Sequence, residues 1–332
     1  MQDGRTDVAV RTDVPGRDVQ AGVARPPLVY PILAFGLVSF ASSAILIRYA
    51  HEAPGVTIAV WRTLLSVVLL LPVVALHRKR ERYRFSRRDF LLMLGAGVLL
   101  ALHFIMWIES LYYTSVASAT VLVTTSPVFS AVLGYVLLGE RISRGDIAGV
   151  LLATFGAALI GWGDASQEGT DSLFGNALAL AAAVVFSLYL IIGRVVRQQA
   201  TWLGYVFPLY CVVTVLILAF ALVRETPLLG FSPAFYGLCL IMAIGPQLLG
   251  HGSFNYAIRY FSAALLGLLT LLEPVGATIM AYFLFDEVPG WMARVGILTV
   301  LASVAFVVAR DQHRKYRGRV VKADAEGLRD DV

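Results

Sequence analysis

Charged residues are scarce in this chain, and their scarcity excludes an ordinary soluble fold. Asp, Glu, Lys and Arg make up 15% of the 332 residues, whereas soluble domains carry about a quarter. Apolar residues make up 58% of the chain, and the mean hydropathy is +0.75. These residues come in long runs, which a buried soluble core does not require. The composition therefore predicts an integral membrane protein.

Several signatures of chemistry are also missing. The only two cysteines, Cys211 and Cys239, lie inside apolar runs, so neither a disulfide framework nor a cysteine metal site is expected. The sequence contains no P-loop, no serine-nucleophile motif and no cluster with metal-ligand spacing. The net charge of +5 resides in the tails and a few loops, unlike the basic face of a nucleic-acid-binding domain. We therefore expect no enzyme active site, cofactor, metal or nucleic-acid partner.

Ten apolar segments follow one another between residues 28 and 309, mostly joined by short loops. Most are close to the length of about 20 residues that crosses about 30 Å of hydrocarbon as a helix. Lipid offers no water to the backbone, so these segments must be helical. The sequence predicts an all-α integral membrane protein with ten transmembrane helices, namely Leu28–Tyr49, Gly55–Leu76, Phe90–Leu111, Ser115–Leu138, Ile147–Trp162, Gly175–Gly193, Leu203–Val223, Phe235–Ala257, Ala263–Phe285 and Trp291–Ala309.

The distribution of Lys and Arg predicts how these helices are oriented. An even number of spans puts both tails on one side, and the loops on that side carry 12 of these residues against 4 on the other. Seven of the 12 lie between residues 77 and 89. The positive-inside rule therefore places both tails in the cytoplasm and the protein in the cell membrane.

The chain repeats itself at a constant offset, the one that superposes Pro127 on Pro274. Proline and glutamate are rare in such segments, so their joint match is informative; with a one-residue shift, Phe40 and Arg48 also meet Phe186 and Arg194. The ungapped matches include Tyr113 with Tyr260, Ser115 with Ser262, Pro127 with Pro274, Tyr135 with Tyr282, Glu140 with Glu287 and Gly149 with Gly296.

We therefore predict two five-helix repeats, residues 28–163 and 174–310, between a disordered tail (1–27) and a basic tail (311–332). Five is odd, so the second repeat begins on the opposite side of the bilayer and the two are inverted. Inverted repeats are typical of secondary transporters, whose solute site lies near the midplane between the halves.

Three stretches resemble the EamA-type members of the drug/metabolite transporter superfamily. They are Ala117–Arg141 with Ser126-Pro127 and Gly139-Glu140-Arg141, Glu273-Pro274 followed by Asp286-Glu287, and Pro54 ahead of Trp61-Arg62. The resemblance implies an alternating-access carrier whose fifth and tenth helices lie outside the central cavity. Many bacterial members of this family export amino acids or other small metabolites. The second copy departs from the first, with Asp286-Glu287-Val288 in place of Gly139-Glu140-Arg141.

Glu273 is the sharpest candidate for a functional residue. It lies eleven residues into its segment, near mid-membrane, and Pro274 removes a backbone donor next to it. An ionisable group there costs about 2.5–3.5 kcal/mol on insertion scales, and loss of water favours the protonated carboxyl. We expect Glu273 to exchange a proton during transport or to pair with a cationic group of the solute. The alternative is a permanently protonated side chain that bonds a neighbouring helix.

Polar and aromatic side chains on two further helices are candidates for solute contact. His103 and Trp107 are four residues apart, so they share a helix face. Trp107 would then stack on the solute or, equally, anchor the helix at the outer interface. Gln247, His251 and Asn255 are also four residues apart, in one predicted stripe. This stripe would line a cavity or bond to other helices.

The remaining candidates lie beside helix breaks or near a membrane surface. Ser126, ahead of Pro127, is the first-half counterpart of Glu273, and interhelical packing is its favoured role. Pro246 is expected to break the helix just before Gln247. Arg62 lies seven residues into its helix, where it would pair with Glu109, bind a solute carboxylate or snorkel to the interface. Thr120 and Thr124 accompany Ser126, and Glu140 and Glu287 are predicted to be structural.

These observations predict a secondary carrier, with a small-molecule solute, the lipid bilayer and protons as its partners. Export of a small metabolite such as an amino acid is the main hypothesis. Efflux of cationic drugs and transport of a sugar-like solute remain open alternatives. A membrane-embedded enzyme or a non-transporting scaffold would belong to another class, and the inverted duplication argues against both.

Overall fold

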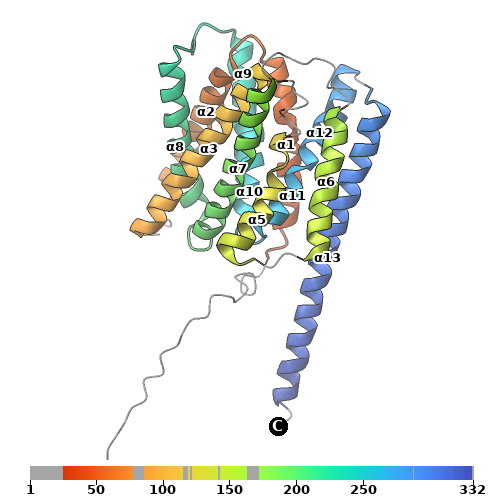
Figure 1. The fold of residues 1–332 in the computed structure, drawn as a ribbon. Coiled ribbons are helices and arrows are strands. Elements are labelled where there is room, and N and C mark those ends of the chain that lie inside the picture. Colours follow the sequence, from red (N-terminus) through yellow and green to blue (C-terminus); the bar gives the residue numbers. More distant parts are fainter. Residues whose placement is uncertain are drawn as a thin grey trace, which may run out of the picture.

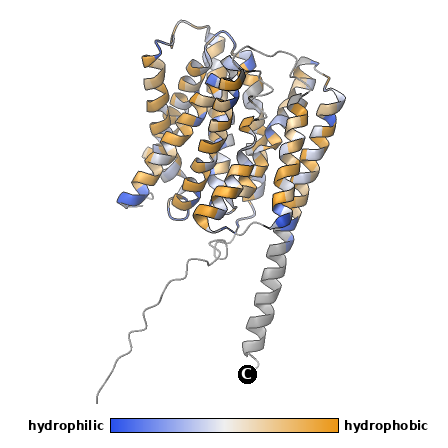
Figure 2. Ribbon diagram, viewed as in Figure 1, coloured by the Kyte–Doolittle hydropathy of each residue, from blue (hydrophilic) through white to orange (hydrophobic). Residues whose placement is uncertain are grey.

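Long apolar helices make up the described part of this chain. The computed structural model describes residues 25–77, 86–114, 119, 122–140, 143–162, 172–286 and 288–330, and all regular structure within them is helical (Figure 1). Eight helical stretches there are long and apolar enough to cross a bilayer, and Ser126–Leu138 is a shorter apolar helix. Figure 2 shows apolar residues along the helices and hydrophilic residues gathered near their ends. The predicted all-α membrane fold is confirmed, although eight full-length spans, not ten, meet these criteria.

The helices follow the predicted segments closely, with two differences. The eighth predicted segment is one continuous rod of three pieces (α9, η1 and α10), and the ninth is divided into α11 and α12. Thr120, Arg141 and Glu287 lie outside the described residues, as do the cation-rich loop 78–85 and residues 163–171. In chain order the helices are α1 Val29–Tyr49, α2 Gly55–His77, α3 Arg87–Tyr113, α5 Ser126–Leu138, α6 Arg144–Trp162, α7 Ser172–Val196, α8 Trp202–Val223, α9 Pro233–Met242, η1 Ala243–His251, α10 Gly252–Ala257, α11 Ala263–Thr270, α12 Leu272–Phe285 and α13 Trp291–Asp330.

Helix bounds repeat at the offset that superposes Pro127 on Pro274 in the sequence. The first residues of α2 and α8 are separated by this same offset, and so are the first residues of α6 and α13. The last residues of α1 and α7 keep it as well, as do the last residues of α5 and α12. The two halves therefore share one pattern of helices.

Short polar residues set several of these bounds. Ser86 caps α3 through its hydroxyl, which accepts a hydrogen bond from the Asp89 backbone N–H at 3.1 Å in a capping box. Helices α5 and α12 end in left-handed residues at matching positions, Gly139 with φ 63° and Asp286 with φ 55°. Glycine adopts this conformation freely, and aspartate is among the side chains that tolerate it. The substitution of Asp286 for the glycine of the first half thus preserves the same helix end.

Helices α6 and α13 pack against each other at one side of the bundle (Figure 1). Glycines allow the close approach: a Cβ atom on Gly156 would lie 2.9 Å from the Gly296 carbonyl oxygen. The reverse contact, from Gly296 to the Gly156 carbonyl oxygen, would be 2.5 Å. Small residues at such a crossing let two membrane helices come into backbone contact. Helix α13 continues past the membrane-length stretch that ends at Arg310, as far as Asp330.

Two buried arginines bind the chain at the end of the bundle where α7 terminates, and one of them, Arg194, joins the two halves through Glu140. Arg194 Nη1 donates to the Ile258 carbonyl oxygen at 2.8 Å, and its Nε lies 3.6 Å from a carboxylate oxygen of Glu140. Arg197 Nε donates to the Asn255 carbonyl oxygen at 2.8 Å. Burial lowers the pKa of Arg197 to about 10, so the side chain is still cationic at neutral pH. Both arginines contribute to the predicted excess of 12 Lys and Arg residues in the loops of one side, yet they bind backbone carbonyls inside the protein.

Candidate functional site

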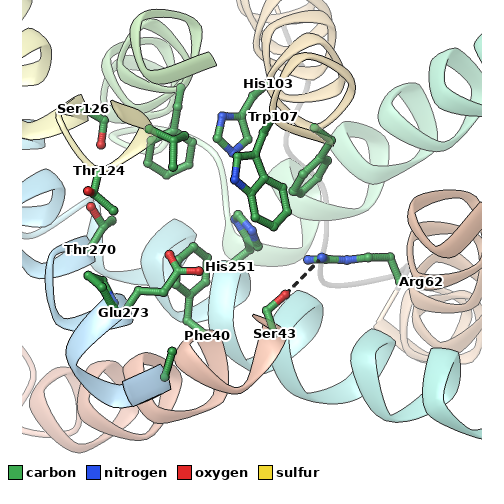
Figure 3. Close-up of a pocket in the computed structure, with 15 residues that line it drawn as sticks. Phe40, Ser43, Arg62, His103, Trp107, Thr124, Ser126, His251, Thr270 and Glu273 are labelled. Atoms are coloured by element: carbon green, nitrogen blue, oxygen red, sulfur yellow. Dashed lines mark hydrogen bonds between the residues drawn. The ribbon is translucent and has the colours of Figure 1, made fainter. Parts of the chain in front are cut away.

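A cavity lies at the centre of the bundle, where helices of both halves meet (Figure 3). Its volume is about 80 Å³. In the described part of the chain, α6 and α13, which are the fifth and tenth predicted spans, contribute nothing to its lining, in agreement with what the family resemblance implies. The lining residues are Phe40, Ser43, Arg62, His103, Phe104, Trp107, Val123, Thr124, Ser126, Phe186, His251, Thr270, Glu273, Pro274 and Ala277. We call this space the central cavity.

Two interrupted spans bring polar groups to the central cavity. Helix α5 begins at Ser126 with Pro127 in its first turn, and α12 begins at Leu272 with Pro274 in its first turn. Proline has no backbone N–H, so it is tolerated where the first turn leaves that donor unpaired. The predicted breaks at Pro127 and Pro274 thus coincide with helix starts. They place Ser126 and Glu273, which match each other in the repeat, at equivalent points of the lining.

Near Pro246 the α-helical hydrogen-bond ladder is interrupted, but the helix does not end. Pro246 lies inside η1, a nine-residue π-helix that continues α9 without interruption. A π-helix uses i→i+5 hydrogen bonds and is frequent at functional sites. Its wider turn changes the direction in which the following side chains point, and this matters for the polar residues on the same helix.

Gln247, His251 and Asn255 do not form one stripe along the cavity. All three are buried, but only His251 lines the central cavity. Gln247 is bonded to Arg62, and Asn255 Oδ1 accepts a hydrogen bond from the Tyr189 hydroxyl. Gln247 and Asn255 therefore form hydrogen bonds to other helices, which was the alternative interpretation of the stripe. His251 lines the cavity.

Arg62 is held by polar side chains inside the bundle. Its Nε and Nη2 donate to Gln247 Oε1 at 3.1 and 2.8 Å, and Nη1 lies 3.4 Å from Ser43 Oγ. Only 4% of the residue is exposed, so the predicted snorkelling to the interface is wrong. The alternative pairing with Glu109 is wrong as well, because Glu109 lies 3.8 Å from Arg224 instead.

Arg62 and Glu273 approach the central cavity from opposite sides, one from α2 and the other from α12 (Figure 3). Within the described residues, neither a hydrogen bond nor an ion pair joins them. The position equivalent to Arg62 in the second half is Leu209, and the one equivalent to Glu273 in the first half is Ser126. Each half therefore supplies one ionisable group, a guanidinium or a carboxyl, at a position where its counterpart is not ionisable.

Aromatic rings surround His251, which lies between Arg62 and Glu273 (Figure 3). The His251 ring lies edge-on to Phe40, Phe104 and Phe186, with centroid separations of 4.7, 5.4 and 6.4 Å. The guanidinium carbon of Arg62 is 5.0 Å from the centroid of Phe104. Such cation–π contact favours a cation in an otherwise apolar setting. The cavity wall thus combines aromatic rings with polar side chains from both halves.

His103 and Trp107 both face the central cavity, as solute contact would require. His103 Nδ1 lies 3.0 Å from the Ala182 carbonyl oxygen. A carbonyl oxygen only accepts, so Nδ1 carries a proton. Trp107 Nε1 is buried and has no hydrogen-bond partner among the described residues. The position of Trp107 in the cavity lining favours the solute-contact interpretation over anchoring at the interface.

Some of the residues that line the cavity were not predicted from the sequence. Phe40, Phe186 and Thr270 lie in the wall of the cavity, although only the first two had a signal. Phe40 and Phe186 match each other when the halves are compared with a one-residue shift, which points to equivalent positions. Thr270 ends α11 at the break, where nothing in the local sequence distinguishes it from a packing residue.

Comparison with known proteins agrees with this architecture. The sequence model of the EamA-like transporter family matches residues 28–162 and, a second time, residues 173–309. The chain belongs to the EamA-like transporter family. The fold is also that of a solved protein described only as "Crystal structure of protein", with a TM-score of 0.74 and 15% identity over 87% of this chain and 99% of that one.

Relatives of this EamA-like protein are transporters by name. A "Probable terminal-alkyne amino-acid exporter" from Streptantibioticus cattleyicolor is 28% identical, over 90% of this chain and 97% of that protein. An "Uncharacterized transporter" from Archaeoglobus fulgidus is 26% identical, over 85% and 98%. Mouse "Solute carrier family 35 member G1" is 24% identical, over 85% and 78%. The protein is therefore a multi-pass membrane transporter of the EamA-like family.

Proposed function

We propose that this transporter exports a small zwitterionic metabolite, such as an amino acid, across the cell membrane by alternating access. Both tails would lie in the cytoplasm, as the positive-inside rule predicts. The observation that carries the proposal is the placement of Arg62 and Glu273, a guanidinium and a carboxyl group that neither a hydrogen bond nor an ion pair joins, on two sides of one small cavity in the described part of the chain. A zwitterion supplies one complementary charge to each of them.

Arg62 is suited to the carboxylate end of such a solute. Guanidinium groups bind carboxylates through planar, charge-assisted hydrogen bonds. Gln247 accepts from Nε and Nη2, while Nη1 has only the long contact to Ser43. Because an amide oxygen is neutral, Gln247 orients the guanidinium group and leaves its positive charge uncompensated.

Glu273 is suited to the ammonium end and to coupling with protons. A carboxylate binds an ammonium group, whereas a protonated carboxyl has lost the charge that attracts it. Proton and solute would therefore compete for Glu273, and this competition produces exchange of one for the other. Since a ligand shifts a conformational equilibrium by its differential affinity for the two states, alternate occupancy by proton and solute would drive alternating access.

The charge distribution and the relatives together favour this solute class over the alternatives. A cationic drug would meet the uncompensated charge of Arg62, and a sugar-like solute would leave both charges unpaired in a water-poor site. The relative named as an amino-acid exporter supports both the solute class and the direction.

Metabolite profiling tests the proposal directly. Cells producing the wild-type protein should accumulate one or a few amino-acid-like zwitterions in the medium, and cells producing Arg62→Gln at equal abundance should not. The solutes found would then be tested with proteoliposomes under an imposed pH gradient. Accumulation only of solutes that lack a carboxylate, or no difference between the two strains, would refute the proposal.

A further inference from the structure

A second cavity lies beyond the central one, at the end of the bundle where the α1–α2 connection is. Its volume is about 220 Å³, larger than that of the central cavity. The loop residues His51 and Ala53 are among its lining residues, and Ile47, Ile58 and Ile108 form apolar walls. We call this space the vestibule.

The vestibule and the central cavity share two wall residues, Arg62 and Trp107. Both present hydrogen-bond donors in a buried setting. Arginine stays protonated in proteins, so the buried Arg62 guanidinium group donates as a cation. Trp107 Nε1 has no partner among the described residues. Two buried donors at the boundary between two cavities define a point where an acceptor group of a solute can be held from either side.

The other walls of the two cavities differ in one decisive respect. The central cavity contains Glu273, whereas none of the described residues that line the vestibule is acidic. The vestibule is therefore complementary to a carboxylate with an apolar body, and an ammonium group finds no anionic partner there. Apolar walls around a few directed polar groups are usual in small-molecule sites.

We propose that the vestibule is a second subsite that binds an apolar carboxylate, with the carboxylate on Arg62 and Trp107 and the apolar body between the isoleucines. This inference rests on the proposed function, in which Arg62 binds the solute carboxylate. A solute leaving the central cavity would keep its carboxylate on Arg62 while its body turns into the vestibule. The ammonium group would leave Glu273 in the same movement, which frees that carboxyl group for a proton.

The probe is 4-methylpentanoate, an apolar carboxylate without an ammonium group, and 4-methylpentanamide is its uncharged control. Binding to the full-length protein in lipid nanodiscs is measured by calorimetry. Ala59→Phe fills the vestibule and Ala277→Phe fills the central cavity, so the two variants form a matched pair. We expect Ala59→Phe to weaken probe binding at least 10-fold, Ala277→Phe to change it less than 2-fold, and the amide not to bind.

The reverse pattern, with loss in Ala277→Phe only, would overturn the proposal, and so would absence of probe binding to the wild type. If Ala59→Phe fails to yield monodisperse protein, Ile108→Phe fills the same space and is held to the same expectation. Glu273→Gln separates the two proposals. It should abolish exchange of the zwitterion for protons but leave probe binding within 2-fold, so either proposal can fail without the other.

Discussion

Gln247 accepts two hydrogen bonds from Arg62, at 2.8 and 3.1 Å, between side chains that are both nearly inaccessible to solvent. Gln247 lies on a π-helix and Arg62 on α2, 185 residues away in the chain. The contact fixes the guanidinium group without neutralising it. The charge of Arg62 therefore remains available to a solute. The contact can be tested by giving residue 247 a charge while keeping the shape of its side chain.

Gln247→Glu should weaken solute binding at least 10-fold while the protein remains folded. The new carboxylate would form a buried ion pair with Arg62 and compete with the solute for it. We expect the apparent affinity for the zwitterion, measured by calorimetry in nanodiscs, to fall at least 10-fold. Ser43→Ala, which removes only the 3.4 Å contact with Nη1, is the control and should change it less than 2-fold. Wild-type affinity in Gln247→Glu would show that Arg62 does not bind the solute.

Glu273→Gln should remove the pH dependence of solute binding. Proton and ammonium compete for the wild-type carboxyl group, so binding should strengthen as the pH rises and the proton leaves. A glutamine does not titrate, and its binding should be weak and flat between about pH 5 and pH 9. The measurement is affinity against pH in nanodiscs. Ser126→Ala, at the equivalent position of the first half, should retain the wild-type profile. Superimposable profiles for Glu273→Gln and wild type would remove Glu273 from coupling.

The membrane fold was predictable because its causes are local to each segment. A run of apolar residues of sufficient length must be helical in lipid, whatever its neighbours are. The repeat carried further information, because a match between rare residues such as Pro127 and Pro274 identifies equivalent positions. That match predicted the paired helix breaks at which Ser126 and Glu273 meet the cavity.

The partners of the polar side chains were not predictable in the same way. The expected stripe of Gln247, His251 and Asn255 assumed regular α-helical geometry, and the π-helix at residues 243–251 invalidates that assumption. Gln247 bonds Arg62, and Asn255 bonds Tyr189, 66 residues away. Such pairings depend on how each helix is rotated in the bundle, and a single sequence contains no local signal of that rotation.

Glu140→Gln should destabilise the protein by about 3 kcal/mol, the cost of leaving one partner of a buried ion pair uncompensated. The side chains of Arg194 and Glu140 are only 4% and 10% exposed. Glu109→Gln is the matched control. Its partner Arg224 is 57% exposed, so its loss should cost less than about 1 kcal/mol. Unfolding in a mixed-micelle denaturant series measures both variants, and equal losses would contradict a structural role for the Glu140 pair.

Gly156→Leu should separate α6 from α13, because the new side chain would occupy the space of the Gly296 backbone. A Cβ atom at Gly156 would already lie within 2.9 Å of the Gly296 carbonyl oxygen and 3.0 Å of Val300. Overpacking of this kind typically costs about 1–3 kcal/mol, which should appear as a lower melting temperature in fluorescence-detected size-exclusion chromatography. Gly237→Leu on α9 is the control, since a Cβ atom there would meet nothing within 4 Å. Neither helix lines the central cavity, so the Gly156→Leu protein that remains folded should still bind the zwitterion with wild-type affinity. A binding defect in a Gly156→Leu protein of wild-type stability would instead make the α6–α13 pair part of the transport machinery.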